Sequence, residues 1–290
     1  MKHKLISKIY LVFVLLVLFV QAGCIKKTTR LPDSQRLLPA KDATRGELLQ
    51  GLETRAKQIA SLKATVAIDF SRGGAKSGVL DEYRETKGYL FVERPSHIRV
   101  QVQAPLVLTT VAVMVSDGQQ YRLSIPVKNQ FAIEDVHAPI SAKNSLGNLR
   151  PQVFLDALFV DVMPYLNQPN VGRLFEEAVV GVRSYYVVTF VDTSGPELQV
   201  LEKIWIDRTD LEVGRKQIFG KEGRLEQDVE YQEYHEEDGI RYPKVVVIQR
   251  PVEDFTVKLT FQQTTMNEKL EAKIFDLPRP EGSQLVQLTQ

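Results

Sequence analysis

The most regular feature of the sequence is an alternation of hydrophobic and polar positions with a period of two. Leu62, Ala64, Val66, Ile68 and Phe70 alternate with mostly polar or small residues, which is typical of a half-buried β-strand. Similar segments, joined mostly by short turns, recur as far as residues 255–261. Because short turns join antiparallel neighbours, the pattern predicts a sheet of about ten or eleven strands.

Two segments show helical spacing instead. Thr44 and Glu47 fit a capping box, in which the two residues satisfy each other's backbone N–H groups at the start of a helix. Hydrophobic residues follow at helical spacing, at Leu48, Leu52, Ala56 and Ile59. Farther along, Pro151 stands where a first helical residue is tolerated. It predicts a short apolar helix that ends at Pro164.

These elements predict the fold class. An antiparallel sheet of this size must close on itself, or cover its edges and its apolar face. We therefore expect a mainly β (α+β) fold: a half-open antiparallel β-barrel with the two helices as a lid. The pattern contains no repeat or internal boundary, so one domain is expected over residues 42–282, followed by a C-terminal tail at 283–290.

Two stretches are apolar on both faces of their predicted strands. They are residues 106–115 and the run Tyr185-Tyr186-Val187-Val188. A strand in a half-solvated sheet has one polar face, so something must cover the second apolar face. The pattern leaves three options open: a helix over an ordinary dry core, a ligand, or a membrane.

The N-terminus has the layout of a secretory signal, with three lysines before an apolar run at residues 9–20. This run is shorter than the roughly 20 residues that a membrane-spanning helix needs. Ala22-Gly23-Cys24 then resembles a bacterial lipobox, where the signal is cleaved before a cysteine that carries lipid. Gln21 departs from that pattern, which expects an apolar residue at this position.

We predict that residues 1–23 are a signal peptide, that Cys24 is lipidated, and that residues 24–41 form a flexible tether that reaches roughly 20–25 Å. Cys24 is the only cysteine, so in an exported protein it has no disulfide partner within the chain. Two or more acyl chains hold a protein stably on a membrane. An ordinary signal peptide with a chance cysteine, and an uncleaved anchor, are the alternatives.

The residue after the lipidated cysteine bears on the location. In bacterial lipoproteins an aspartate there often retains the protein at the inner membrane, and here that residue is Ile25. In a two-membrane organism the resemblance therefore implies the periplasmic side of the outer membrane, with the inner membrane and the cell surface as alternatives.

The charge balance argues against a nucleic-acid partner. The chain has 37 Lys+Arg and 36 Asp+Glu, and residues 1–23 contain three lysines and no acidic residue. The mature chain therefore has 34 basic against 36 acidic residues. A nucleic-acid-binding protein has a basic excess instead.

A search for catalytic groups selects nothing. His97, His137 and His235 are isolated, and the acidic residues around His235 favour a solvated turn over a metal site. The sequence has no Gly-x-Ser-x-Gly elbow, phosphate-binding glycine loop or Cys-x-x-Cys pair. We therefore expect no enzyme activity, cofactor or metal.

Several segments follow one another in an order that is itself informative. A lipobox and tether precede a capped helix and a first strand, and further pieces follow in the same order. They are Gly88-Tyr89-Leu90-Phe91-Val92 with Arg94-Pro95, Ile98-Arg99-Val100, Ser116-Asp117-Gly118, Ile204-Trp205-Ile206-Asp207 and Ile274-Phe275-Asp276-Leu277-Pro278-Arg279-Pro280. Together these segments resemble the LolA/LolB-like superfamily of lipoprotein carriers and receptors, and the resemblance covers most of residues 44–282. The chain has extra length around residues 135–180.

The resemblance implies a membrane-anchored, non-enzymatic carrier or receptor that shelters acyl chains of lipids or lipoproteins in an apolar cavity. The candidate lining residues are Leu48, Leu52, Phe70, Phe91, Val100, Val113, Phe131, Phe154, Phe159, Phe190 and Trp205. Ordinary core packing is the alternative for each of them. The alternative function is a structural lipoprotein that scaffolds an envelope complex through a protein partner. A hydrolase of envelope polymers ranks third.

Overall fold

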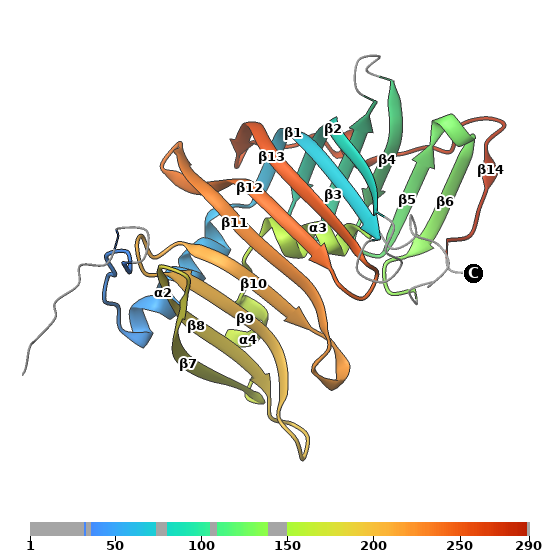
Figure 1. The fold of residues 1–290 in the computed structure, drawn as a ribbon. Helices are drawn as coiled ribbons and strands as arrows, with labels where there is room; N and C mark the ends of the chain where they lie inside the picture. The colour runs from blue at the N-terminus through green and yellow to red at the C-terminus, as the bar shows by residue number, and fades with distance from the viewer. Residues whose placement is uncertain (1–31, 33–35, 74–79, 105–108, 139–149, 289–290) are drawn as a thin grey trace, which may run out of the picture. The chain divides into compact units, whose positions relative to one another are not determined.

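One open sheet forms the body of the protein (Figure 1). The computed structural model describes residues 32, 36–73, 80–104, 109–138 and 150–288. Residues 37–290 make up one compact unit. The predicted signal peptide, Cys24 and much of the tether lie outside the described residues.

The described strands are β1 (Ser61–Gly73), β2 (Leu80–Glu93), β3 (His97–Gln103), β4 (Thr110–Ser116), β5 (Gln120–Ile125), β6 (Gln130–Asp135), β7 (Val171–Val180), β8 (Arg183–Asp192), β9 (Gln199–Asp207), β10 (Val213–Phe219), β11 (Leu225–Glu237), β12 (Ile240–Arg250), β13 (Phe255–Met266) and β14 (Gln284–Leu285).

The strand order determines how the chain crosses the sheet. The order is β14-β6-β5-β4-β3-β2-β1-β13-β12-β11-β10-β9-β8-β7, so β6 and β7 lie near opposite edges although they are consecutive in the chain. All neighbouring strands are antiparallel except β14 and β6, which are parallel. The connection from β6 to β7 must therefore span the sheet, and it carries the helices α3 (Pro151–Leu158) and α4 (Met163–Leu166).

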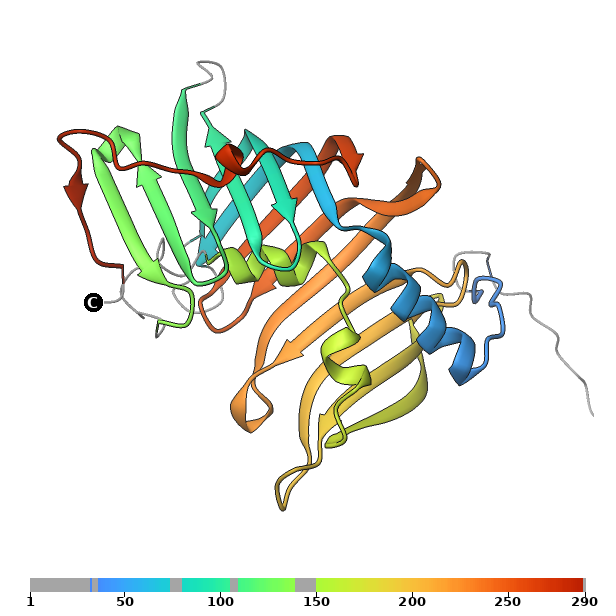
Figure 2. The same cartoon turned by 180° about the vertical axis from the view of Figure 1, so that it is seen from behind.

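The helix α2 (Arg45–Gln58) begins with the predicted capping box. The Glu47 backbone N–H donates to Thr44 Oγ1 at 3.3 Å, and the Thr44 N–H donates to Glu47 Oε2 at 2.7 Å. Leu48, Leu52 and Ala56 are its buried residues. Figure 2 shows α2, α3 and α4 on the same face of the sheet, which we call the helix face. The opposite side is the outer face.

The structure confirms the predicted fold class, a mainly β fold with an open, predominantly antiparallel sheet and a helical cover. It has more strands than the sequence predicted, because β7 and the two-residue β14 were missed. β7 is an edge strand with mostly exposed side chains, so it lacks a buried alternation. The prediction that Pro164 ends the apolar helix was wrong. That helix ends at Leu158, and Pro164 belongs to the first turn of α4.

The doubly apolar stretch around residues 106–115 now has an explanation in its described part, β4. Met114 belongs to the large core on the helix face. Val113 and Val115 point to the outer face, where Leu270 and Phe275 of the C-terminal segment cover them. Arg99 donates to the backbone oxygen of Ile274 at 3.1 Å and holds that segment in place. In β4, protein side chains therefore cover both apolar faces.

Candidate functional site

The helix face presents a continuous apolar surface because the strands are in register. Side chains on a strand alternate between faces. Leu62 pairs with Val92, which pairs with Ile98, so their side chains line up across three strands. Val257 and Ile248 continue the surface on β13 and β12. This surface is where a sheet of this kind would accept an apolar ligand or a covering helix.

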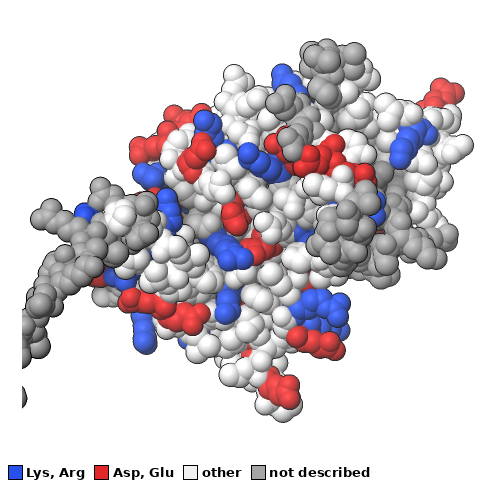
Figure 3. Space-filling view, viewed as in Figure 1, with Lys and Arg blue, Asp and Glu red and all other residues white. Residues whose placement is uncertain are grey.

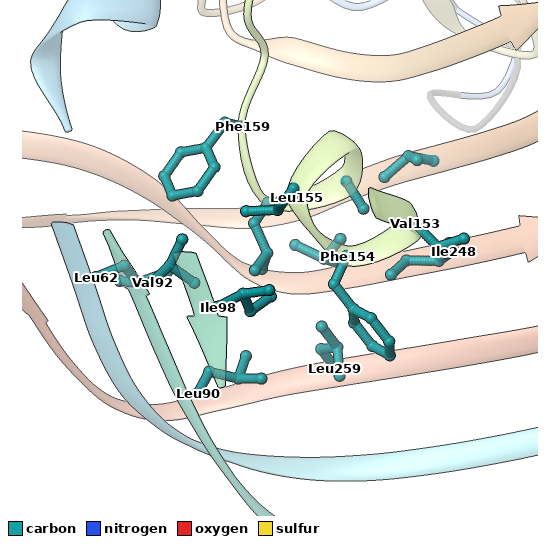
Figure 4. Packing of buried hydrophobic residues seen from close by; sticks show 14 of the residues in the cluster. Leu62, Leu90, Val92, Ile98, Val153, Phe154, Leu155, Phe159, Ile248 and Leu259 are labelled. Carbon is teal, nitrogen blue, oxygen red and sulfur yellow. The ribbon is translucent and has the colours of Figure 1, made fainter. Parts of the chain in front are cut away.

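The helix α3 lies over this surface with most of its side chains buried. Its buried residues are Pro151, Val153, Phe154, Leu155, Ala157 and Leu158. Figure 4 shows Phe154, Leu155 and Phe159 among side chains of the strands, including Ile98, Leu259 and Ile248. α3 therefore fills the part of the helix face on which it lies.

Three buried side chains of the sheet hold α3 by hydrogen bonds to its backbone oxygens. Lys216 Nζ on β10 donates to Asp156 O at 3.0 Å and to Phe159 O at 3.3 Å. Gln227 Nε2 on β11 donates to Val153 O at 3.1 Å. Tyr242 OH on β12 donates to Leu158 O at 3.2 Å. The last carbonyls of a helix have no partner within the helix, and a cation near them is favourable.

Lys216 also belongs to a buried cluster of ionisable groups. Its Nζ lies 3.6 Å from Glu202 Oε2, and Tyr165 OH of α4 donates to the same oxygen at 3.3 Å. Burial raises the pKa of Glu202 to about 7, although the nearby Lys216 acts in the opposite direction. Burial also raises the pKa of Asp156 on α3. Within the described residues, Glu202 Oε1 and Tyr231 OH are buried without a hydrogen-bond partner.

Arg94 connects α2 to the segment that follows α3. Its guanidinium donates to the Ala56 backbone oxygen, near the end of α2, and to the carboxylate of Asp161. It also lies 5.3 Å from the centre of the Phe159 ring. Arg94, the residue after β2, therefore joins the end of α2 to the segment between α3 and α4.

The structure divides the predicted lining residues between the two faces of the sheet. Those on the helix face, in or against the core, are Leu48, Leu52, Phe70, Val100, Phe154, Phe159 and Phe190. The other four are Phe91, Val113, Phe131 and Trp205. Each of these four is adjacent in sequence to a residue of the helix-face core and therefore points to the outer face.

The polar residues that hold α3 were not among the predicted site residues. Lys216, Gln227 and Glu202 are polar side chains at inward positions of strands, and the residues two positions before and after each of them are apolar or glycine. The sequence does signal the inward facing of Glu202 and Gln227, because each replaces an apolar residue in the alternation of its strand. Lys216 had no such signal, because a bulge between Val213 and Arg215 shifts the register of β10.

Neither a metal site nor a membrane-spanning helix is found in the described part of the chain. No group of three or more His, Cys, Asp or Glu side chains there has an arrangement that could hold a metal ion. His235 lies on β11, where its Nε2 is 3.9 Å from Glu237 Oε2. Among the same residues, no helix is long and apolar enough to cross a membrane.

Comparison with known proteins identifies the fold. No protein-family model and no curated protein matches the sequence. Among solved structures, the chain is similar to a LolA superfamily protein from Nitrosomonas europaea, with a TM-score of 0.51 and 12% identity over 81% of this chain and 99% of that chain. It is also similar to a DUF1329 family protein from Desulfovibrio piger, with a TM-score of 0.52 and 12% identity over 79% and 94% of the two chains. The resemblance to the LolA/LolB-like superfamily is thus confirmed at the level of the fold.

Proposed function

We propose that this protein is a non-enzymatic carrier or receptor that shelters acyl chains of lipids or lipoproteins on the helix face of its LolA-like sheet. One observation carries the proposal. Three donors, Lys216 Nζ, Gln227 Nε2 and Tyr242 OH, lie beside a continuous apolar surface, and all three donate to carbonyl oxygens of α3.

The chemistry of α3 matches that of an acylated ligand. A lipid or an acylated protein presents ester or amide carbonyls next to a hydrocarbon chain. α3 presents backbone carbonyls to the same donors and the side chains of Phe154 and Leu155 to the apolar surface. The donors and the surface can therefore serve a ligand when α3 moves away. Each CH2 group of an acyl chain transferred from water to this surface gains about 0.8 kcal/mol.

Loading is then an exchange between α3 and the ligand. α3 is eight residues long, and its buried side chains occupy the surface in this structure. An acyl chain has room there only when α3 is displaced. The hydrogen bonds that α3 loses are remade with the ligand's carbonyls, so the exchange leaves few buried donors unsatisfied.

The experiment measures acyl-chain binding by the chain expressed without residues 1–24, because the compact unit begins at Leu37. A fluorescent fatty acid is displaced by an acylated lipopeptide. We expect saturable binding. Tyr242→Phe should weaken the binding of the lipopeptide by roughly two- to tenfold more than it weakens the binding of an alkane of equal length, because the alkane has no carbonyl for Tyr242 to donate to. Tyr185→Phe on the outer face is the matched control. Absence of saturable binding, or equal effects of both variants on both ligands, would refute the proposal.

The location is part of the proposal. Cleavage before Cys24 and its acylation would attach the chain to a membrane, and Ile25 favours the outer membrane by resemblance to bacterial lipoproteins. Two or more acyl chains on Cys24 would give stable attachment, whereas a single chain is marginal. The tether would then keep the acyl-binding face near the membrane surface.

A scaffold in an envelope complex is the second candidate, and the edge strand β7 favours it. In the described part of the chain, β8 is its one strand neighbour. Leu174, Val179 and Val180 on β7 are 54%, 59% and 56% exposed. A free edge with apolar side chains accepts a strand of a partner protein. If Val179→Lys abolishes a pull-down partner and leaves fatty-acid binding unchanged, the scaffold role is supported.

A further inference from the structure

A second concave site lies on the outer face, on the other side of the sheet from the apolar surface. A hollow of about 660 Å³ spans β8 to β11 and the start of β12. Volumes of roughly 300–1,000 Å³ are usual for small-molecule sites. On the corresponding face in Figure 3, basic and acidic side chains lie side by side. The proposed acyl carrier makes no use of this hollow.

Two aromatic rings form one wall of the hollow. The Tyr185 and Trp205 rings lie 5.9 Å apart, centre to centre, at an angle of 79°. Gly214 makes room for Tyr185, because a Cβ atom at that position would lie 3.2 Å from Tyr185 Cε1. Trp205 Nε1 donates to Gln217 Oε1 at 3.0 Å, which fixes the orientation of the indole.

Three arginines line the hollow, and each is anchored by a buried carboxylate. Arg183 pairs with Asp207 at 2.5 Å and Arg241 with Glu212 at 2.9 Å. Arg215 Nε donates to Asp228 Oδ1 at 2.7 Å. The carboxylate side chains are 6–9% exposed, whereas the arginine side chains are 37–51% exposed. The guanidinium groups are therefore held in fixed positions and remain accessible from the hollow.

The charge of the lining disfavours a polyanion. The lining has three arginines, Arg183, Arg215 and Arg241, but five carboxylates, those of Asp207, Asp210, Glu212, Glu230 and Glu233. Phosphate-rich ligands need an excess of positive charge. A long hydrocarbon is disfavoured too, because it would desolvate these charged pairs without compensation.

We propose that the hollow binds a glycan. A sugar ring has hydroxyl groups that both donate and accept hydrogen bonds, and one face made of C–H groups. The arginines supply donors. Glu230, the cross-strand neighbour of Arg215, supplies an acceptor. Tyr185 supplies an aromatic surface of the kind on which a C–H face stacks, beside Trp205, whose ring Arg215 already contacts with its Cζ atom 5.7 Å from the ring centre. In a cell envelope, such a ligand comes from peptidoglycan or from the saccharide of a lipopolysaccharide.

The experiment uses Trp205 as an internal probe, because it is the only tryptophan of the chain. The full mature protein is kept in a detergent without a sugar head group, since a glycoside would compete. It is titrated with chitotetraose, with a peptidoglycan disaccharide-peptide, and with deacylated lipopolysaccharide oligosaccharide, and tryptophan emission is recorded. A saturable change with one of these probes is the expected result, and the probe that binds identifies the source.

Variants locate the binding in the hollow. Tyr185→Ala should weaken binding by roughly five- to tenfold, and the half-exposed Arg183→Gln should weaken it without affecting the fold. Tyr83→Ala, which removes a 62% exposed tyrosine of β2, is the matched control and should bind like the unaltered protein. Thermal melting verifies that each variant is folded.

Three results would overturn the proposal. The first is no saturable change of emission with any glycan up to about 10 mM, which corresponds to very weak affinity. The second is unchanged glycan binding by both Tyr185→Ala and Arg183→Gln. The third is a change of emission with the cationic peptide hexalysine and with none of the glycans, which both variants lose. The carboxylates of the hollow would then bind a cationic partner.

Discussion

Glu202 is a carboxylate at an inward position of β9, where the alternation of the strand predicts an apolar side chain. Glu202 shares the helix face with Ile204 and Ile206 and is 2% exposed. An ion buried in protein loses several kcal/mol of solvation. Lys216 and Tyr165 offset part of this cost, and Tyr231 and Asp156 face the same cluster. The net effect is a carboxyl group with a pKa of about 7 beneath the helical cover.

This raised pKa predicts that stability falls with pH. The folded chain holds the Glu202 proton more tightly than the unfolded chain, so between about pH 4.5 and 7 it binds more protons. The stabilisation is complete below pH 4.5 and is lost as the pH rises to about 7. Glu202→Gln should remove a pH-dependent change of the order of 2 kcal/mol in the free energy of unfolding. Denaturant titrations at pH 5 and pH 8 measure it.

The control for this prediction is Glu236→Gln, which alters an exposed glutamate of β11. It should leave the difference between pH 5 and pH 8 unchanged. Some slope will remain in Glu202→Gln, because burial raises the pKa of Asp156 in the same direction. Parallel pH profiles for Glu202→Gln and the unaltered protein would contradict the assignment.

At the scale of elements, α3 is the part whose movement the proposed function requires. Leu155 on α3 is 7% exposed, so a thiol at this position reacts slowly while α3 covers the sheet. In the chain without residues 1–24, Leu155→Cys introduces the sole cysteine. We expect a saturating acyl ligand to increase the labelling rate of Cys at this position several-fold, since it keeps α3 away from the surface.

The matching control is Gln152→Cys on the exposed side of α3. Its thiol should react fast with and without ligand. If ligand binds but slows or does not change labelling at position 155, then α3 stays in place and the acyl chain binds elsewhere. Thiol labelling followed by mass spectrometry distinguishes these cases.

Elements with a strong local signal were predictable from the sequence. The capping box of Thr44 and Glu47 located the start of α2, and the alternation from Leu62 to Phe70 identified the main part of β1. β7 was not predictable, because its exposed edge position removes the alternation. The break between α3 and α4 was missed, because a proline is compatible both with the end of one helix and with the first turn of the next.

The facing of strand residues was predictable only in part, and this limited the prediction of the site. Phe91 and Trp205 were grouped with Phe190, but they point to the opposite side of the sheet. A shift of one residue exchanges the two faces of a strand. On β2 and β9 both faces carry large apolar side chains, so the pattern contains no information about which one faces the helices. The polar contacts of Lys216 and Tyr242 depend on long-range packing and were not visible in the sequence.

At the scale of the whole molecule, the strand order connects the fold to the proposed function. Because β6 and β7 lie near opposite edges, the segment between them must cross a face of the sheet, and it brings α3 and α4 over the apolar side. Beside α2, the cover is thus this crossing connection, which packs apolar side chains of α3 on the sheet and is also held by polar contacts to its backbone. The crossing connection lies on the other side of the sheet from the hollow beside Trp205, so it does not block the proposed glycan site.

The last prediction concerns the proposed attachment to the membrane through an acylated Cys24. Cys24→Ala removes the only thiol that could be acylated. The core lies in residues 37–290, so the variant should keep the same melting temperature. If residues 1–23 are still removed, the protein should move from the membrane fraction to the soluble periplasmic fraction, because no acyl chains remain to hold it. Fractionation with immunoblotting measures the location of the protein, and the mass of the N-terminal peptide shows whether residues 1–23 were removed.

Gln21→Leu, which introduces the usual lipobox residue, is the control and should stay on the membrane. A Cys24→Ala protein that stays membrane-bound with residues 1–23 removed would show that something other than lipid holds it there.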